Sequence, residues 1–264
     1  MSLSMHIAPH LPYLRRFSRA LTGNQTSGDA YVVAVLEAIV ADPTNFVAEP
    51  DLKISLYGKF CELWETLSLD MHNGHYPNSW EELAQRKLSK ISPAARIAFL
   101  LFAVEGFSHQ DIAKILGQND DVIEQLLEEA SRTILDEVAA NVMIIEDEPL
   151  IALDLQFILE SLGHRVVGVA RTETEAIQLA SKSNPQLVLA DIQLADGSSG
   201  IDAVNAILSN RSLPVIFITA YPERLLTGEK PEPAFLITKP FLADMVKALV
   251  SQALFFNSTA TADA

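Results

Sequence analysis

Two kinds of hydrophobic spacing divide the chain. From Pro12 to about Val138, apolar residues recur every three or four positions, and this is the period of an amphipathic helix. After Val142, short apolar runs alternate with amphipathic stretches, the pattern of a parallel sheet with crossover helices. The runs are VMII, RVVGV, QLVLA, PVIFI and AFLI. The sequence therefore predicts an all-α N-terminal domain followed by an α/β domain.

The change of period at Ala139 to Asn141 predicts the domain boundary. We expect a helical domain over residues 1–138, an α/β domain over 141–256 and a disordered polar tail over 257–264. The segment Asp70 to Trp80 contains Gly, Pro and Asn and is expected to break the helical domain into two lobes. Within it His72 and His75 suggest a metal site, but no carboxylate or Cys stands at ligand spacing, which favours a surface loop.

Composition narrows the function classes. The chain has 34 acidic and 19 basic side chains, a formal charge of -15, and both halves share the excess, which opposes binding to a nucleic acid. No run of 18 apolar residues and no secretory signal is present, so we expect a cytoplasmic protein without a membrane span. Cys61 is the only cysteine and is expected to be a buried structural thiol, while Trp64 and Trp80 are expected in the core.

Reactive side chains follow four of the five predicted strands. Glu146 and Asp147 follow VMII, Asp191 follows QLVLA, Thr219 follows PVIFI, and Lys239 follows AFLI. The carboxyl ends of parallel strands form the crevice in which ligands bind, so these side chains are expected to converge.

Three clustered carboxylates repel one another, and a hard divalent cation such as Mg²⁺ relieves that repulsion through oxygen ligands. We expect Glu146, Asp147 and Asp191 to be its ligands. Asp191 is then available as a nucleophile toward a phosphoryl group, Thr219 can donate a hydrogen bond to that group, and Lys239 can pair with its charge.

This constellation resembles a bacterial response-regulator receiver over residues 141–256, a (βα)5 domain of the flavodoxin-like class. The resemblance implies that Asp191 is the phosphoacceptor, that Asp147 and Asp191 bind the metal directly, and that Glu146 binds it through water. It also implies a cis Lys239-Pro240 bond. Two departures stand out: the usual aromatic switch position is Leu236, with Phe235 one step earlier, and prolines between Pro222 and Pro233 predict a short or distorted helix.

The segment Ile91 to Leu135 has the layout of a helix-turn-helix. Ser108 and Asp111 predict the start of a helix, Gly117 its end, and Asp120 the start of a second one. On spacing alone, a DNA-reading motif and a plain helical scaffold remain equally open.

Two stretches of this half resemble extracytoplasmic-function sigma factors. GFSHQDIAKILG resembles their region 4, over about 88–137, and HLPYLRRFSRALTGN resembles their region 2, over about 8–70. Between Asp120 and Glu129 there are five acidic side chains and no basic one, so we expect that the second helix does not bind DNA. The acidic side chains are Asp120, Asp121, Glu124, Glu128 and Glu129.

A sigma-like domain followed by a receiver resembles the PhyR family of anti-anti-sigma regulators. The resemblance implies a response regulator and not an enzyme: a sensor histidine kinase phosphorylates Asp191, the protein opens, and the sigma-like domain captures an anti-sigma factor of the NepR type, which releases a stress sigma factor. The alternative is a DNA-binding response regulator or a true sigma factor.

Overall fold

A computed structural model describes residues 3–43, 46, 51–73, 92–135, 139–194, 196–209, 211–222, 225 and 233–260, with side chains described except at 67–73, 133–135 and 256–260. The chain divides into two compact units, built mainly from Met1–Ala130 and from Ser131–Leu225 with Pro233–Ala264. This division falls inside a helix, before the change of hydrophobic period at 139–141, and the predicted domain limits stay predictions.

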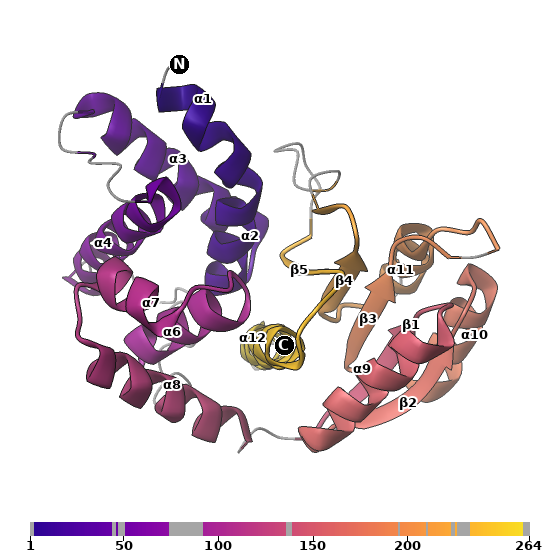
Figure 1. Ribbon diagram of the computed structural model, residues 1–264. Helices are drawn as coiled ribbons and strands as arrows, with labels where there is room; N and C mark the ends of the chain where they lie inside the picture. The colour runs from indigo at the N-terminus through magenta and orange to yellow at the C-terminus, as the bar shows by residue number, and fades with distance from the viewer. Residues whose placement is uncertain are drawn as a thin grey trace. The chain divides into compact units, whose positions relative to one another are not determined.

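The first unit is helical, as predicted (Figure 1). Its elements are α1 (Leu3–Ile7), the 3-10 turn η1 (Ala8–His10), α2 (Leu11–Thr22), α3 (Gln25–Ala41), α4 (Leu52–Asn73), α6 (Pro93–Ala103), α7 (His109–Leu116) and α8 (Asp120–Leu135).

Helices α2 and α3 form a tight hairpin. Gly23 ends α2 in the left-handed conformation, and the side chain of Asn24 accepts a hydrogen bond from the Ser27 N–H to begin α3. Arg19 on α2 forms an ion pair with Asp29 on α3. A Cβ added to Gly28 would lie 2.7 Å from Cγ of Arg19, so only glycine permits this close crossing.

An aromatic cluster fills the core of the helical unit. Phe17 on α2 packs edge-on against Tyr57 and Phe60 on α4, and Phe60 stacks on half-buried Trp64. Cys61 is buried beside them, as predicted, and burial raises the pKa of its thiol. Trp80, His75 and the side chain of His72 lie outside the described residues.

A buried polar network also crosses this core. Arg16 on α2 donates two hydrogen bonds to Oε1 of Glu105, at 2.9 and 3.1 Å, and the Tyr57 hydroxyl donates to Oε2 at 2.7 Å. Lys53 donates to the backbone carbonyl of Glu105 and lies over the Phe107 ring. The network therefore joins α2 and α4 to the turn between α6 and α7.

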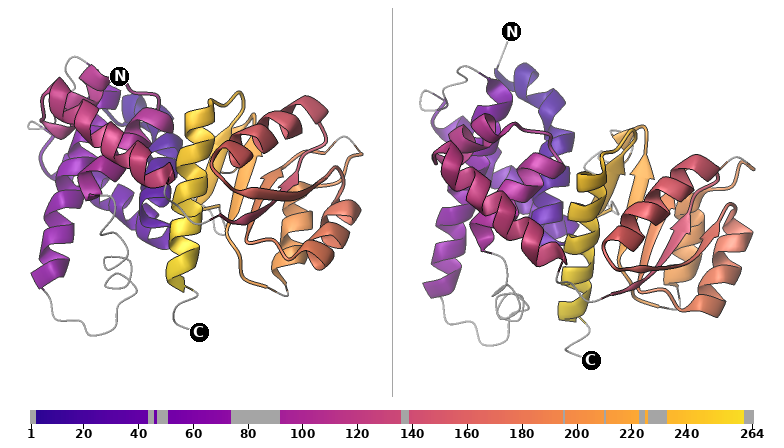
Figure 2. Two further views of the ribbon diagram at one scale, coloured as in Figure 1. Left: turned by 90° about the horizontal axis from the view of Figure 1, so that it is seen from below. Right: turned by 60° about the horizontal axis from the view of Figure 1, so that its bottom comes forward.

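The second unit is a parallel sheet with helices on both faces (Figures 1 and 2). Its strand order is β2-β1-β3-β4-β5, the flavodoxin-like order, and all five predicted strands are present. The elements are β1 (Asn141–Ile145), α9 (Pro149–Ser161), β2 (Arg165–Ala170), α10 (Glu173–Ser183), β3 (Leu187–Asp191), α11 (Gly200–Leu208), β4 (Val215–Thr219), β5 (Phe235–Thr238) and α12 (Ala243–Ala260).

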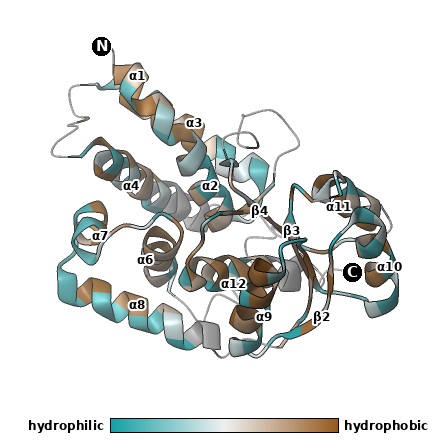
Figure 3. Cartoon of the chain, turned by 45° about the vertical axis from the view of Figure 1, so that its right-hand side comes forward, coloured by the Kyte–Doolittle hydropathy of each residue, from teal (hydrophilic) through white to brown (hydrophobic). Residues whose placement is uncertain are grey.

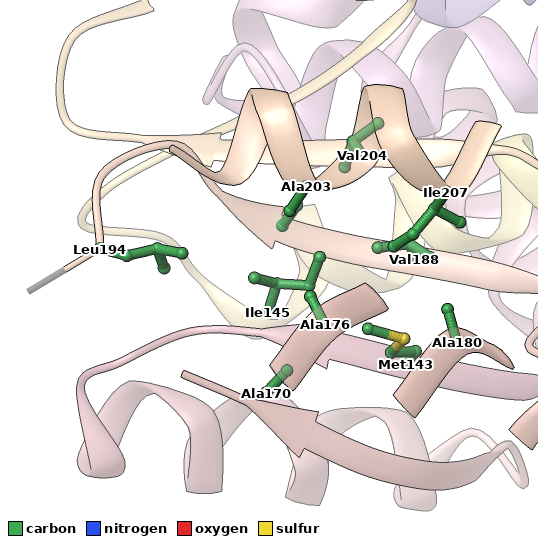
Figure 4. Packing of buried hydrophobic residues seen from close by; sticks show 11 residues of the cluster. Met143, Ile145, Ala170, Ala176, Ala180, Val188, Leu194, Ala203, Val204 and Ile207 are labelled. Carbon is green, nitrogen blue, oxygen red and sulfur yellow. The ribbon is translucent and has the colours of Figure 1, made fainter. Parts of the chain in front are cut away.

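Alternate residues of the strands face the two helical layers. Met143, Ile145 and Val188 point toward α10 and α11 and form one core with Ala176, Ala180, Ala203, Val204 and Ile207 (Figure 4). The buried residues between them on the strands face the layer of α9 and α12, and these two helices contact each other. The inner strands of the sheet are therefore shielded from water on both faces, as continuous apolar strands require.

The described C-terminal end differs from the sequence prediction. Helix α12 continues to Ala260, four residues into the segment 257–264 that we expected to be a disordered tail. The pair Phe255 and Phe256 precedes that segment and extends the apolar stretch of the helix. Of the segment Pro222 to Pro233, only Pro222, Leu225 and Pro233 are described, so the prediction of a distorted helix there lies largely outside the described residues. Among the described residues, every helix is too short or too polar to span a bilayer.

Candidate functional site

Three strand ends of the second unit converge on one ammonium group. Nζ of Lys239, directly after β5, lies 2.7 Å from Oδ2 of Asp191 at the end of β3. The same atom lies 3.0 Å from Oε2 of Glu146, directly after β1, and 3.5 Å from Oε1 of Glu148. The convergence predicted for Glu146, Asp191 and Lys239 is therefore present. The Lys239-Pro240 peptide bond is cis, as the resemblance implied.

The backbone holds Asp191 in a fixed orientation. Its Oδ1 accepts hydrogen bonds from the N–H groups of Ile192 and Gln193, at 2.6 and 3.3 Å, while Oδ2 accepts from Lys239. Asp191 is only 7% exposed. Helix α11 begins against this residue, and a Cβ on Gly200 would overlap the Asp191 carbonyl oxygen. One carboxylate oxygen thus faces the cationic group while the other is fixed by the chain itself.

Glu146 is the fully buried carboxylate of the site. Burial raises its pKa to about 7 from an ordinary value of 4.5, although Lys239 acts in the opposite direction. For Lys239, burial lowers the pKa, but Asp191 and Glu146 outweigh it, so the pKa is raised above its usual value. The lysine therefore stays charged between carboxylates.

Thr219 and Asp147 flank this centre in the sequence of strand ends and make no hydrogen bond or ion pair to Glu146, Asp191 or Lys239 among the described contacts. Thr219 ends β4, the neighbour of β3 and β5, is 6% exposed, and its hydroxyl accepts a hydrogen bond from the Tyr221 N–H at 3.1 Å. Asp147 is half-buried. The carboxylate oxygens that approach within 4.8 Å of one another belong to Glu146, Glu148 and Asp191, and Asp147 is not among them.

The donor set fits a divalent cation. Three carboxylate oxygens converge, which is the ligand chemistry that Mg²⁺ prefers. Oε2 of buried Glu146 has the ammonium group of Lys239 at 3.0 Å as its ion-pair partner and accepts no hydrogen bond of good geometry from the described residues. One lysine balances only part of the negative charge, so a second cation at this position would be stabilised.

Two residues of the site had no role in the sequence prediction. Glu148 directly follows the predicted pair Glu146 and Asp147, and its contact with Lys239 depends on a side-chain conformation that spacing does not reveal. Gly200 was not singled out, although a glycine after two serines, just beyond the phosphoacceptor position, was a usable signal of a close backbone approach. Leu236, at the usual position of the aromatic switch, and Phe235, one step earlier, are both buried in β5.

The helix-turn-helix of the first unit has the predicted caps. The Ser108 hydroxyl accepts from the Asp111 N–H, Gly117 ends α7 in the left-handed conformation, and α8 begins at Asp120. The outward side of α8 is mostly hydrophilic (Figure 3). Four of its five acidic side chains are exposed, namely Asp120, Asp121, Glu124 and Glu128.

Glu129 differs from the other four acidic side chains of this stretch of α8, which are exposed. It is half-buried, and its carboxylate accepts hydrogen bonds from the N–H and the hydroxyl of Ser92, at 2.7 and 3.2 Å. Ser92 is the N-cap of α6, so Glu129 stabilises the start of that helix. The exposed face of α8 is therefore acidic with four charges and not with five.

Family models match three parts of the chain. They are the Sigma2 domain of PhyR over residues 7–61, the sigma-like domain of the response regulator PhyR over 88–137, and the response regulator receiver domain over 142–250. The Phyllosphere-induced regulator PhyR of Methylorubrum extorquens is 52% identical over 98% of this chain and 97% of its own length. The chain belongs to the PhyR family.

Solved structures of PhyR proteins have the same fold. The response regulator PhyR from Brucella abortus is 56% identical, covers 100% of this chain and 98% of its own, and has a TM-score of 0.87. The anti-anti-sigma factor PhyR from Bartonella quintana is 55% identical over 99% of both chains, with a TM-score of 0.85. The predicted fold class, a helical sigma-like domain with a flavodoxin-like receiver, is confirmed.

Proposed function

We propose that this chain is a phosphorylation-controlled anti-anti-sigma factor. In the proposal, a sensor histidine kinase phosphorylates Asp191, the protein opens, and the sigma-like domain binds an anti-sigma factor of the NepR type, so that a stress sigma factor is released. The observation that carries the proposal is that one chain has the cluster of Glu146, Asp191 and Lys239, a receiver match and two PhyR sigma-like matches. The Bartonella quintana relative is itself an anti-anti-sigma factor.

The receiver chemistry follows from the geometry around Asp191. A carboxylate oxygen of Asp191 attacks the phosphorus of the kinase phosphohistidine, the O–P bond forms as the P–N bond breaks, and the histidine nitrogen keeps the electron pair and takes up a proton. Glu146, Asp147 and Asp191 are proposed to hold Mg²⁺, which, when bound, neutralises part of the phosphoryl charge.

Lys239 and Thr219 are proposed to bind the new phosphoryl group. Lys239 already lies 2.7 Å from Asp191, so a small side-chain movement brings its ammonium group to a phosphoryl oxygen. The Thr219 hydroxyl accepts from the Tyr221 N–H, and its own proton can be donated to the phosphoryl group. Both contacts form only after phosphorylation, so they favour the activated state.

Sigma-factor mimicry without promoter binding is supported by charge. The exposed face of α8 presents acidic side chains, and a DNA-reading helix needs basic or amide side chains aimed at phosphates and base edges. The proposed partner of this domain is a protein and not DNA, because an anti-sigma factor recognises the shape of a sigma factor. We place the switch in the cytoplasm, where the released sigma factor meets RNA polymerase.

The second candidate is a DNA-binding response regulator or a true sigma factor. The helix-turn-helix caps at Ser108 and Gly117 favour it, and the charge of α8 opposes it. Salt-dependent binding to promoter DNA, or copurification with core RNA polymerase, would support this candidate over the first.

The receiver part of the proposal is tested by phosphoryl transfer. The full-length protein is incubated with acetyl phosphate and Mg²⁺, and the intact mass is measured for the wild type and for Asp191→Asn. We expect one phosphoryl group on the wild type and none on the variant. A wild type that stays unmodified with acetyl phosphate and with phosphorylated kinases, or a variant modified to the same extent, contradicts the proposal.

A further inference from the structure

Two arginines of the helical unit each reach from one sigma-like part to the other. The N-lobe is the described part of residues 3–73, which includes the match at 7–61, and the C-lobe is residues 92–130, within the match at 88–137. Nη2 of Arg16 on α2 donates to the carbonyl oxygen of Val104 at 2.9 Å, and Nη2 of Arg96 on α6 donates to the carbonyl oxygen of Leu21 at 2.9 Å. Both arginines are buried. Each lobe therefore contributes one buried cation to the other.

Both carbonyl groups lie at the C-terminal end of a helix. Val104 is the C-cap of α6, and Leu21 is in the last turn of α2. The last four carbonyl groups of a helix have no partner within it, and the helix dipole makes this end negative. Arg16 therefore completes the end of α6, and Arg96 completes the end of α2. We call these two reciprocal hydrogen bonds the arginine clasp.

The arginine clasp favours one placement of the lobes. Apolar packing between helices has no preferred direction, whereas a hydrogen bond from a guanidinium group requires a defined distance and angle. Burial lowers the pKa of Arg96 to about 10, so this group stays charged at neutral pH, and another placement would cost it the hydrogen bond to Leu21. Buried charges add little net stability, and they can instead select one arrangement of helices.

We propose that Arg16 and Arg96 are positioning residues, which hold the N-lobe and the C-lobe in the relative placement that an anti-sigma factor recognises. The identity of the partner rests on the proposed function, while the arginine clasp rests on contacts within the helical unit. Lobes that are fixed in advance lose little freedom when a partner binds, so the clasp contributes to the affinity without a contact to the partner.

The test compares buried arginines that differ in where their partners lie. Arg16→Lys and Arg96→Lys, the clasp variants, keep the charge, but an ammonium group lacks the planar fork of a guanidinium group. The control variant is Arg19→Lys, which changes another buried arginine of α2, whose ion-pair partner Asp29 is in the same lobe. The two clasp arginines are replaced separately, so that one variant carries the test if the other does not fold.

Distances between the lobes are measured by double electron–electron resonance in the full-length protein without a partner. Nitroxide labels are attached to Glu37→Cys on α3 and Glu124→Cys on α8, both exposed positions, in a Cys61→Ala background. We expect one narrow distance distribution for the parent and the control variant, and a broader or split distribution for the clasp variants. Labels at Glu37→Cys and Glu62→Cys, both within the N-lobe, are expected to give narrow distributions throughout.

The affinity of the phosphorylated full-length protein for a purified NepR-type anti-sigma factor is measured by calorimetry. We expect each clasp variant to bind about tenfold more weakly than the wild type, and the control variant to bind within about twofold of it. Narrow distances between the lobes in the clasp variants overturn the inference. An equal affinity of the clasp and control variants also overturns it, because the placement of the lobes would then not matter for recognition.

The two measurements separate the inference from the proposed function. A wild type that binds no anti-sigma factor contradicts the proposed function, and with it any role of the arginines in recognition. The distances between the lobes, which need no partner, still show in that case whether Arg16 and Arg96 hold the lobes in one placement.

Discussion

At the scale of single residues, Gly200 ties the start of α11 to the backbone of the phosphoacceptor candidate. A Cβ at this position would overlap the Asp191 carbonyl oxygen, which is backbone and cannot move without disturbing the site. We expect Gly200→Ala to lower the free energy of unfolding by about 3 kcal/mol, the upper range for forced overpacking. Denaturant unfolding of the full-length protein measures this effect.

Gly197 is the matched control for this prediction. Gly197 lies in the loop directly before α11 with φ of +80°, and a Cβ there meets nothing within 4 Å. Gly197→Ala should therefore cost only the strain of a left-handed residue, about 1 kcal/mol. Equal effects of the two substitutions would show that the contact with Asp191 is not what requires glycine at position 200.

The raised pKa of Glu146 predicts an unusual dependence of the free energy of unfolding on pH. Its pKa is about 7 in the folded chain and 4.5 ordinarily, so the folded state favours the protonated form. In metal-free buffer its contribution to stability is full below pH 4.5 and is lost as the pH rises through 7. We expect Glu146→Gln to gain stability relative to the wild type between pH 5 and pH 8, measured by chemical unfolding. Parallel profiles for the two proteins would refute this assignment.

At the scale of elements, a buried network connects the two sigma-like matches of the first unit. Arg16 and Tyr57 belong to the segment 7–61, and Glu105 belongs to 88–137. The side chains of Arg16 and Glu105 are 5% and 1% exposed. A buried ion pair loses much of its hydration, so the removal of one partner is costly even where the pair itself adds little.

We expect Glu105→Gln to destabilise the protein by about 3 kcal/mol, because Arg16 would keep a buried charge without a counter-charge. The control is Glu62→Gln, which breaks the exposed pair with Lys59 and should cost at most about 0.5 kcal/mol. Thermal and denaturant unfolding of both variants measure the two values. A Glu105→Gln protein as stable as Glu62→Gln would mean that the network does not hold the two segments together.

Sequence alone predicted most of these elements and fewer of their contacts. Strand positions, the caps at Ser108 and Gly117, and the convergence of Glu146, Asp191 and Lys239 follow from local pattern and from the geometry of parallel sheets. The partners Arg16 and Glu105 are 89 positions apart, and nothing local in the sequence connects them.

Side-chain conformation set a second limit on prediction. The placement of Glu148, and not Asp147, beside Lys239 depends on conformation and burial, which spacing does not encode. Glu129 was counted with the other acidic side chains of α8, yet its carboxylate accepts hydrogen bonds from Ser92, the N-cap of α6, because the tertiary fold brings the two residues together. The polar tail was predicted to begin at 257, but α12 continues to Ala260.

At the scale of the whole molecule, phosphorylation and partner binding are proposed to act on one equilibrium. If both favour the open form, each must strengthen the other by the same factor. A change from mostly closed to mostly open requires roughly 5 kcal/mol of differential binding. This exceeds what one new ion pair supplies, so the anti-sigma factor is expected to complete the opening that the phosphoryl group begins.

The affinity of the full-length protein for its anti-sigma factor tests this central claim most directly. It is measured by calorimetry with the phosphorylated wild type, the unmodified wild type and Asp191→Ala, each with Mg²⁺. We predict that phosphorylation tightens binding at least about tenfold, within the usual range of allosteric coupling, and that Asp191→Ala binds like the unmodified protein in the presence of the phosphoryl donor. Equal affinity of the phosphorylated and unmodified proteins would contradict the account.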